Sequence, residues 1–237
     1  MLKYILAIII FGVIIFIHEF GHFFVAKLCG IKVNKFALGM GPKILKKQIG
    51  ETEYSLRLFP VGGFCAMEGE DQESENSRAF GNKPVWKRML VIVAGAFMNI
   101  LLGFVLIVIL TCMRSAVPST IVGGFSTQSE TSEIITAQSY ECGLREGDEI
   151  IKMDGMRIFT PSDLSYQLYS DDDGKFDIVV KRDGKKITLN DVIFHDSATD
   201  SVIDFQIKGL NKNPLNVLAF SGKDTVSTAR MIWISLV

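Results

Sequence analysis

Two histidines and a carboxylate near the start of the chain have the types and the spacing of a hydrolytic metal site. His18, Glu19 and His22 belong to the pentad His-Glu-Phe-Gly-His. Residues four apart on a helix project from one face, with Cβ atoms about 5–6 Å apart, so His18 and His22 could bind one Zn²⁺. Glu19 is turned away from that pair, where it could act as general base on a water whose pKa zinc lowers towards 7. Gly21, between the histidines, leaves room for a neighbouring backbone to approach.

The residues around the pentad are apolar, although its side chains are those of water chemistry. Residues 14–17 and 23–25 are isoleucine, phenylalanine or valine. Ionisable groups in a membrane helix cost at least ~2.5–3.5 kcal/mol each and are functional by default. A peptide bond in lipid can be hydrolysed only where an enzyme brings metal and water to that depth. The alternative is a metal-free lock, in which the histidines hydrogen-bond to neighbouring helices.

The composition favours a membrane protein and excludes some classes of partner and cofactor. Hydrophobic residues make up 48% of the 237 residues, and the net charge is −1, so nothing indicates nucleic acid as a partner. The cysteines are scattered without a C-x-x-C pair, which favours neither a disulfide framework nor a cysteine zinc site. They are Cys29, Cys65, Cys112 and Cys142.

Two apolar stretches, residues 1–28 and 89–113, predict membrane helices, since about 20 residues suffice to cross a bilayer. The first could instead be a signal peptide, but no small-x-small cleavage site follows it. A third apolar stretch starts at Met231, at the end of an amphipathic segment, residues 214–237. We therefore expect the chain to be a fragment that stops inside a third span.

The distribution of basic residues predicts the orientation of the spans. Lysine and arginine gather at both ends of residues 29–88, whereas Arg114 is the only basic residue in the thirty residues just beyond the second span. By the positive-inside rule, residues 29–88 are cytoplasmic, and residues 114 to about 230 lie outside with the N-terminus.

The cytoplasmic segment has short β-prone runs punctuated by glycines. Within it, residues 60–64 (Pro-Val-Gly-Gly-Phe) predict the turn of a hairpin that lies against the bilayer. Residues 71–77 predict a solvated acidic loop.

The outer segment, residues 117–208, predicts a separate small β-rich domain. A strand is expected at residues 149–153, and Asp-Gly pairs at 154–155 and 183–184 predict tight hairpins. Thr160 and Pro161 predict the N-cap and the first position of a helix.

Four separated motifs, taken in order, resemble the bacterial site-2 protease family of intramembrane zinc metalloproteases, in its regulator-of-sigma-E-protease branch. The resemblance covers essentially the whole chain. It implies a multi-pass α-helical protein of the bacterial inner membrane, with a cytoplasmic-side membrane-associated β-hairpin region and an extracytoplasmic β-rich PDZ domain. The motifs are HEFGHFFVAKLCGIKVNKFALGMGP, GETEYSLRLFPVGGFCAMEGED, RAFGNKPVWKRMLVIVAGAFMN and AFSGKDTVSTARM.

The resemblance also implies roles for individual residues. His18 and His22 would bind zinc, and Glu19 would be the general base. Asn99 would lie near the metal and bind the substrate backbone or the developing oxyanion; the alternative is a helix-packing hydrogen bond. The remaining candidates, Gly62, Gly63 and Phe64, would form an edge that pairs with an unwound substrate strand, unless they make an ordinary hairpin turn.

The chain departs from the family pattern in three places. Gly95-Ala96 stands where Gly-Pro is frequent, and Phe64 stands where tyrosine is common. The family's third zinc ligand, an aspartate in a later Leu-Asp-Gly motif, is absent from the given residues. We expect that ligand beyond Val237, and the fragment by itself to bind zinc incompletely.

These features predict an intramembrane zinc endopeptidase that cuts transmembrane segments of other proteins. Anti-sigma factors already trimmed outside, or remnant signal peptides, are the expected substrates within the lipid bilayer. The PDZ domain would bind peptide strands or filter substrates by size. The alternative is a non-catalytic membrane adaptor that binds client proteins through its PDZ domain.

Overall fold

The computed structural model describes residues 2–125, 137–170, 174–194 and 203–236. The chain divides into two compact units, residues 1–103 and 104–237, and each is treated by itself. The prediction that residues 117–208 form one domain falls partly outside the described residues.

Two long apolar helices begin and close the first unit. α1 (Leu2–Leu28) contains the pentad, and α2 (Val85–Met113) continues across the boundary between the units. Both are long and apolar enough to cross a membrane. No other helix among the described residues meets this condition. α2 begins four residues before the expected start, so Lys87 and Arg88 belong to its first turn rather than to the loop before it.

α1 ends where the chain reverses direction at Gly30. Gly30 has a φ of +69°, which a residue with a side chain rarely adopts, and the amide of Ile31 donates to the carbonyl oxygen of Ala26 at 2.9 Å. This hydrogen bond satisfies one of the last free carbonyl groups of the helix. The chain then enters the sheet directly.

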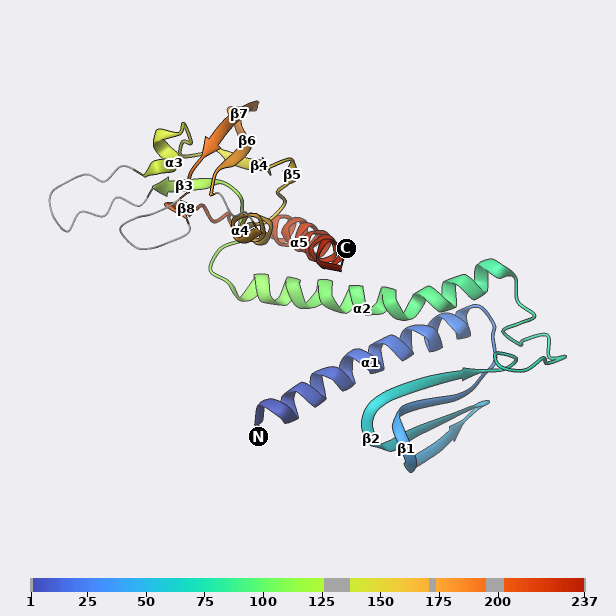
Figure 1. Cartoon of the computed structure of the whole chain (residues 1–237). Helices are drawn as coiled ribbons and strands as arrows, with labels where there is room; N and C mark the ends of the chain where they lie inside the picture. Colours follow the sequence, from blue (N-terminus) through green and yellow to red (C-terminus); the bar gives the residue numbers. More distant parts are fainter. Residues whose placement is uncertain (1, 126–136, 171–173, 195–202, 237) are drawn as a thin grey trace. The chain divides into compact units, whose positions relative to one another are not determined.

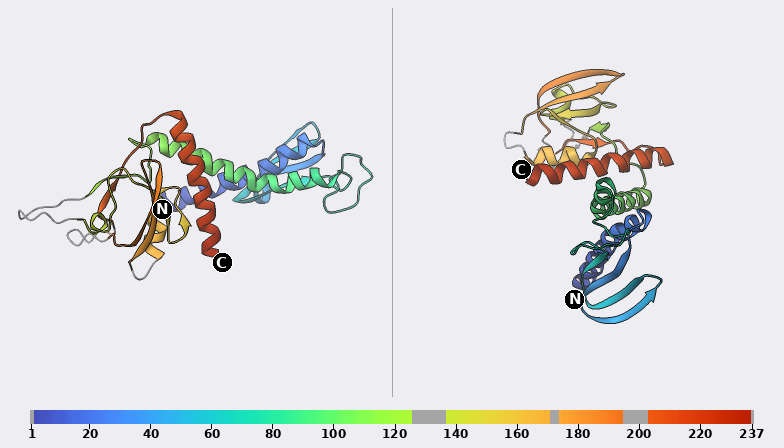
Figure 2. Two further views of the ribbon diagram at one scale, coloured as in Figure 1. Left: turned by 90° about the horizontal axis from the view of Figure 1, so that it is seen from above. Right: turned by 90° about the vertical axis from the view of Figure 1, so that its right-hand side faces the viewer.

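The first unit's sheet consists of two long, bent strands. β1 (Val33–Ile49) and β2 (Thr52–Met67) are antiparallel, and Gly50 and Glu51 form the turn between them. The first half of β1 pairs on one side with residues 63–67 and on the other with residues 53–56, because both strands fold back on themselves. Figures 1 and 2 show α1 lying between this hairpin and the first part of α2.

The predicted turn at residues 60–64 is wrong. These residues lie inside β2, and the hairpin turn is ten residues earlier. Gly62 has a φ of +85° and bends the strand without ending it. A glycine with positive φ is as useful for a bend as for a turn, so composition alone pointed to the wrong element.

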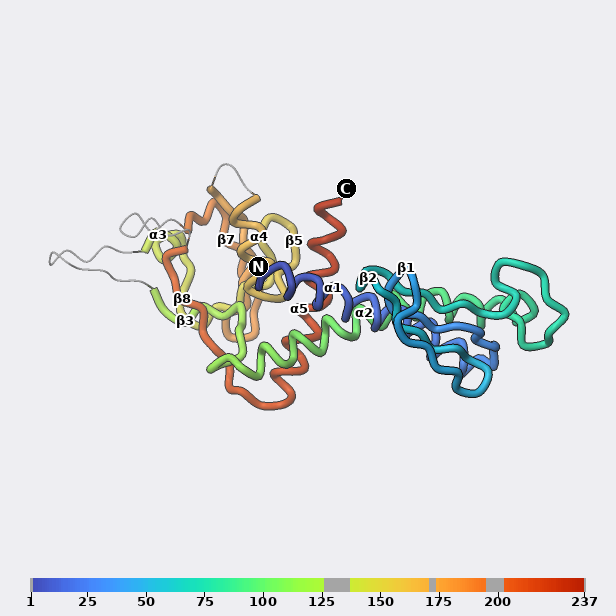
Figure 3. The backbone as a smooth tube through the Cα atoms, turned by 90° about the horizontal axis from the view of Figure 1, so that it is seen from below, coloured from blue at the N-terminus to red at the C-terminus, as the bar shows by residue number. Residues whose placement is uncertain are grey.

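Buried apolar residues and a cluster of charges hold the C-terminal end of α1 to the sheet. Ile31, Val33 and Val91 are fully buried in the core of this unit. Beside it, Arg78 donates two hydrogen bonds to the carboxylate of Glu51, and Lys27 donates a third, each 2.7 Å long. The hydrogen bonds from Arg78, and then that from Lys27, lower the pKa of Glu51 to about 2. Figure 3 follows the loop that carries Arg78 from β2 into α2.

Among its described residues, the second unit combines short strands with three further helices. One sheet has the order β5-β4-β6-β7, and β3 pairs with β8 in another, all antiparallel. The expected strand and both Asp-Gly hairpins are confirmed, with positive φ at all four turn residues. The elements are β3 (Val122–Phe125), α3 (Gln138–Glu141), β4 (Glu149–Met153), β5 (Met156–Arg157), α4 (Pro161–Ser170), β6 (Phe176–Arg182), β7 (Lys185–Val192), β8 (Phe205–Ile207) and α5 (Pro214–Leu236).

A buried ion pair joins the turn before β4 to the end of β6. Asp148 is fully buried, and Arg182 donates to both of its carboxylate oxygens at 2.7 and 2.6 Å. The same guanidinium donates to the carbonyl oxygen of Gly143 at 2.8 Å. Removing Arg182 would leave the charge of Asp148 buried without its partner and so destabilise this unit.

α5 is attached to the start of α4 through one carboxylate. The helix α4 begins at Pro161, as predicted, but the capping contact comes from Asp163, which accepts from the amides of Phe159 and Thr160 at 2.7 and 3.1 Å. The other carboxylate oxygen of Asp163 accepts from Ser227 and, at 2.6 Å, from Arg230. α5 therefore belongs structurally to this unit.

Candidate metal site and substrate edge

The two histidines of the pentad face one another on α1. His18 and His22 are one helical turn apart, and their Nε2 atoms are 3.3 Å apart. Their ring centroids are 4.9 Å apart, with the rings nearly perpendicular. The predicted common face is thus confirmed, and both Nε2 atoms point to the same small volume.

The first part of α2 approaches this volume closely because two glycines permit it. A Cβ atom on Gly21 would lie 2.6 Å from the carbonyl oxygen of Ala94, so only glycine allows this helix crossing. A Cβ atom on Gly95 would lie 2.4 Å from His22 Nε2 and 2.8 Å from His18 Nε2. The expectation that Gly21 admits a neighbouring backbone is confirmed, whereas the part played by Gly95 was not foreseen.

Each imidazole also has a contact from α2 at its other nitrogen. His22 Nδ1 lies 2.7 Å from the carbonyl oxygen of Val91, to which it must donate. His18 Nδ1 lies 3.3 Å from Asn99 Nδ2. Val91, Gly95 and Asn99 are four residues apart in turn, so one face of α2 supports both histidines.

Glu19 points from α1 towards the bent strand β2. A Cβ atom on Gly63 would lie 3.1 Å from Glu19 Cγ and 3.4 Å from a side-chain carbon of Ile15. About two turns before Glu19, on the same face of α1, a Cβ atom on Gly12 would lie 3.8 Å from the carbonyl oxygen of Pro60. β2 therefore runs along the face of α1 that carries Glu19.

The other two residues expected at the substrate edge have different neighbours. Gly62 packs against Met40 of β1, whose Cε would lie 2.6 Å from an added Cβ atom. The Phe64 ring lies under the guanidinium of Arg57, with 4.8 Å between its centroid and Cζ. Residues 63–67 pair with the first half of β1 on one side and with no described strand on the other, whereas residues 53–56 have β1 residues on both sides. Residues 63–67 are therefore one outer edge of this sheet.

The histidine pair fits a tetrahedral metal ion. Two imidazole nitrogens bound to Zn²⁺ at ~2.0–2.1 Å are about 3.3 Å apart, which is the observed separation. The described residues contain no group of three or more histidine, cysteine or acidic side chains that could hold an ion. The third ligand that the resemblance implies therefore stays a prediction.

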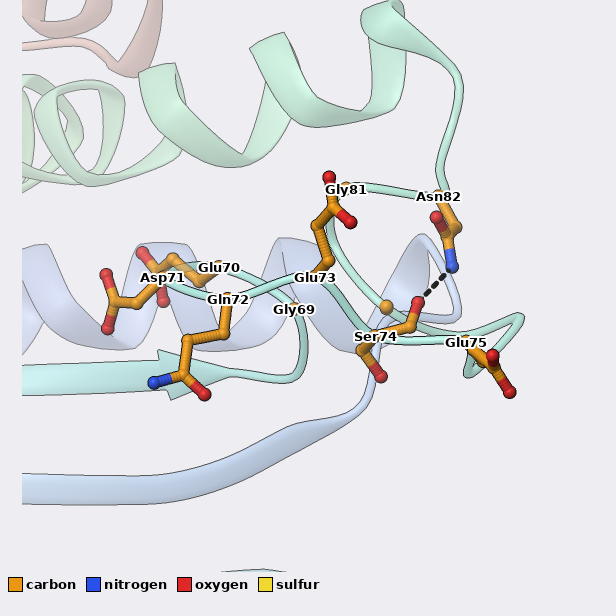
Figure 4. A pocket seen from close by; sticks show the side chains of 10 residues that line it. Gly69, Glu70, Asp71, Gln72, Glu73, Ser74, Glu75, Gly81 and Asn82 are labelled. Carbon is orange, nitrogen blue, oxygen red and sulfur yellow. Dashed lines mark hydrogen bonds between the residues drawn. The ribbon is translucent and has the colours of Figure 1, made fainter.

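A cavity in another part of this unit has a different character. It encloses about 680 Å³ within the acidic loop after β2. Figure 4 shows that the carboxylates of Asp71, Glu73 and Glu75 point in different directions and do not converge. Asn82 instead closes the loop by donating to the carbonyl oxygen of Ser74 at 2.7 Å. We interpret this loop as a solvated surface, as its composition predicts.

Two long apolar helices, packed together around a pair of facing imidazoles, are what a membrane-embedded protein is expected to contain. The chain belongs to Peptidase family M50, whose model matches residues 6–233. It is 40% identical over 184 residues to the Clostridium perfringens protein named "Putative zinc metalloprotease CPE1693", covering 78% of this chain and 52% of that protein. It is 26% identical to the "Regulator of sigma-W protease RasP" of Bacillus subtilis, covering 97% of this chain and 72% of that protein.

A third relative, "Putative zinc metalloprotease FN1322" of Fusobacterium nucleatum, is 31% identical over 203 residues, which are 85% of this chain and 58% of that protein. The chain thus spans about half the length of several curated relatives it matches. Family membership agrees with the resemblance seen in the four sequence motifs.

Proposed function

We propose that the full-length protein is an intramembrane zinc endopeptidase that hydrolyses transmembrane segments of other membrane proteins. The observation that carries this proposal is the pair of His18 and His22 Nε2 atoms, 3.3 Å apart within an apolar helix that is long enough to span a bilayer. A metal-free lock would also show the contacts of both imidazoles with α2. It would not require Gly95 to keep the space beside both Nε2 atoms free of a side chain, and this open space favours the metal site.

Zinc, when bound, supplies a Lewis acid that polarises the scissile carbonyl and lowers the pKa of water. His18 and His22 hold it at a fixed depth in the membrane. Glu19 is the general base: its carboxylate takes a proton from the attacking water and passes it to the leaving amide nitrogen. In this account Glu19 is not a metal ligand, which agrees with its position against Gly63 rather than between the histidines.

The edge at residues 63–67 is proposed to hold the substrate backbone. When the helix of a transmembrane segment unwinds, its backbone groups lose their hydrogen-bond partners. An unpaired strand edge offers N–H and C=O groups that can replace those partners. Gly63 lies beside Glu19, so a strand added to this edge would pass the base. Gly62 gives the bend that keeps the edge along α1, and Phe64 closes the other side of the strand against Arg57.

The proposed substrates are anti-sigma factors already trimmed outside the membrane, or remnant signal peptides. The likeness to a protein named as a regulator of a sigma factor supports the first class. We also propose that the protein is multi-pass in the bacterial cell membrane, that residues 29–88 are cytoplasmic and that residues 117–208 form an extracytoplasmic PDZ domain. The gathering of basic residues beside the first two spans supports this orientation.

Glu19→Gln tests the proposed chemistry in the full-length protein. The variant should keep zinc and lose cleavage of a transmembrane reporter, because glutamine preserves the shape but cannot accept the proton. Glu75→Gln is the matched control, since Glu75 lies in the acidic loop, and it should cleave as the wild type does. Wild-type turnover by Glu19→Gln would remove Glu19 as the base.

A cysteine-accessibility map tests the orientation. Single cysteines at residues 74–77 should react only with a reagent that enters the cytoplasm. Single cysteines at residues 171–173 should react with a membrane-impermeant reagent applied outside. The reverse pattern would overturn the topology while leaving the chemistry intact.

A further inference from the structure

Asn99 has one amide atom near the metal site and the other without a partner. It lies within the apolar helix α2, where water is not available to satisfy a polar group. As placed, its Nδ2 is 3.3 Å from His18 Nδ1, and its buried Oδ1 has no hydrogen-bond partner among the described residues. The oxygen and nitrogen of an asparagine amide are distinguished by the hydrogen bonds they make. Rotating the Asn99 amide by half a turn exchanges Oδ1 and Nδ2, and the hydrogen bonds decide between the two orientations.

The contact at His22 shows what a metal-binding imidazole needs on its other side. Val91 offers a carbonyl oxygen to His22 Nδ1 at 2.7 Å, so that nitrogen carries the proton. In a neutral imidazole, the Nε2 atom then keeps its lone pair for a metal ion. His22 is thus fixed in the tautomer that binds.

His18 reaches the same state only if Asn99 presents its oxygen. With Nδ2 towards His18, Nδ1 must accept a hydrogen bond, and the proton sits on Nε2, where it blocks the metal. With Oδ1 towards His18, Nδ1 donates, and both Nε2 atoms face each other with free lone pairs at 3.3 Å. That arrangement repels itself unless a cation lies between the two nitrogens.

We propose that Asn99 is a positioning residue that accepts a hydrogen bond from His18 Nδ1–H through Oδ1 and holds His18 in its metal-binding tautomer. The inference rests on the proposed zinc site. The main task of Asn99 is then to contact the metal ligand His18 rather than to bind the substrate. Rotating the amide gives the orphaned Oδ1 a partner and turns Nδ2 into the volume that Oδ1 leaves. From there the amide nitrogen can still donate to water or to a substrate carbonyl.

One face of α2 then serves the two histidines in equivalent ways. Val91 supplies a backbone acceptor to His22, Asn99 supplies a side-chain acceptor to His18, and Gly95 lies between them and leaves the metal volume open. A plain helix-packing role for Asn99 would require no particular atom facing His18. The positioning role requires an acceptor there, and this difference can be measured.

The test compares Asn99→Leu with Asn99→Asp in the full-length protein in detergent. Zinc affinity is measured by competition with a chromophoric chelator, and the visible spectrum of the Co²⁺-loaded protein reports ligand geometry. Asn99→Leu should bind zinc about 10–100-fold more weakly and show a changed Co²⁺ spectrum, as expected when a metal ligand loses its hydrogen-bond partner. Asn99→Asp retains an acceptor oxygen and should stay within a few-fold of the wild type.

Zinc affinity of Asn99→Leu within twofold of the wild type, with an unchanged Co²⁺ spectrum, would overturn the proposal. So would an equal loss in both variants, because the acceptor would then not be what matters. If Asn99→Leu does not accumulate, Asn99→Ala is measured in its place, with the same two outcomes. Absence of zinc from the wild type would instead refute the proposed function, so the two failures are distinguishable.

Discussion

Gly95→Ala offers the sharpest test of the geometry around the histidines. The added methyl group would lie 2.4 Å from His22 Nε2, 2.7 Å from His18 Cε1 and 2.8 Å from His18 Nε2. Ordinary contacts of a Cβ atom begin at 3.4 Å, so at least one imidazole must move by about 1 Å. Metal–ligand distances tolerate only about ±0.2 Å, and the two nitrogens can no longer meet one ion.

The expected result is a zinc affinity at least about 100-fold below that of the wild type, with cleavage of a transmembrane reporter lost in parallel. The helix itself should not suffer, since alanine is favoured over glycine in a helix interior by about 0.8–1.0 kcal/mol. A correctly inserted protein without metal is therefore the predicted phenotype.

Gly103→Ala is the matched control on the same helix. Apart from the adjoining backbone of α2, no atom of the described residues lies within 4 Å of the Cβ position at Gly103, so the variant gains the same helix propensity without reaching the histidines. Zinc affinity and reporter cleavage are measured side by side for the two variants and the wild type. Wild-type zinc affinity in Gly95→Ala would refute the packing of α2 against the histidine pair.

Three further predictions concern the structure around the site. Because Arg78 and Lys27 lower the pKa of Glu51 in the folded state, the stabilisation by Glu51 is present above the unfolded pKa of 4.5 and is lost as pH falls towards 2. Glu51→Gln should therefore lower the thermal unfolding temperature at pH 7, by the equivalent of about 1 kcal/mol for a partly exposed network, and much less at pH 3; an equal effect at both pH values would contradict this. Gly21→Val should prevent α2 from approaching, since a Cβ atom there meets its backbone at 2.6 Å, and zinc retention by this variant would speak against the crossing. Asp163→Asn should raise hydrogen exchange at the start of α4 and along α5, because the charged partner of Arg230 is lost; protection equal to the wild type would show that other contacts hold α5.

The local arrangements that the sequence predicted correctly are those whose signal lies within a few residues. The spacing of His18 and His22 is a property of any α-helix, and the apolar stretches around it determine that the helix forms. The Asp-Gly hairpins of the second unit are equally local, because their turn geometry demands positive φ at both central residues.

The predictions that failed involve elements whose form depends on distant contacts. The glycines at 62 and 63 are compatible with a turn or with a bent strand. The bend was selected because the first half of β1 pairs with both halves of β2. The second span was expected to start at Met89, after Lys87 and Arg88, but both residues are good helix formers and lie in the first turn of α2.

Gly95 indicates close packing in the sequence, but the sequence does not show what packs against it. A glycine in a helix interior is destabilising relative to alanine, which suggests a packing reason. The reason lies on α1, so it becomes visible only when the two helices are placed together. The same holds for Asn99, whose partner on His18 could not be inferred from spacing along the chain.

The most direct test of the central claim is the zinc content of the purified full-length protein, measured by mass spectrometry for the wild type, His18→Ala and His22→Ala. The account predicts about one zinc ion per wild-type chain and almost none in either variant, because each variant removes one of the two facing nitrogens. A wild type without zinc, or histidine variants that retain it fully, would contradict the account.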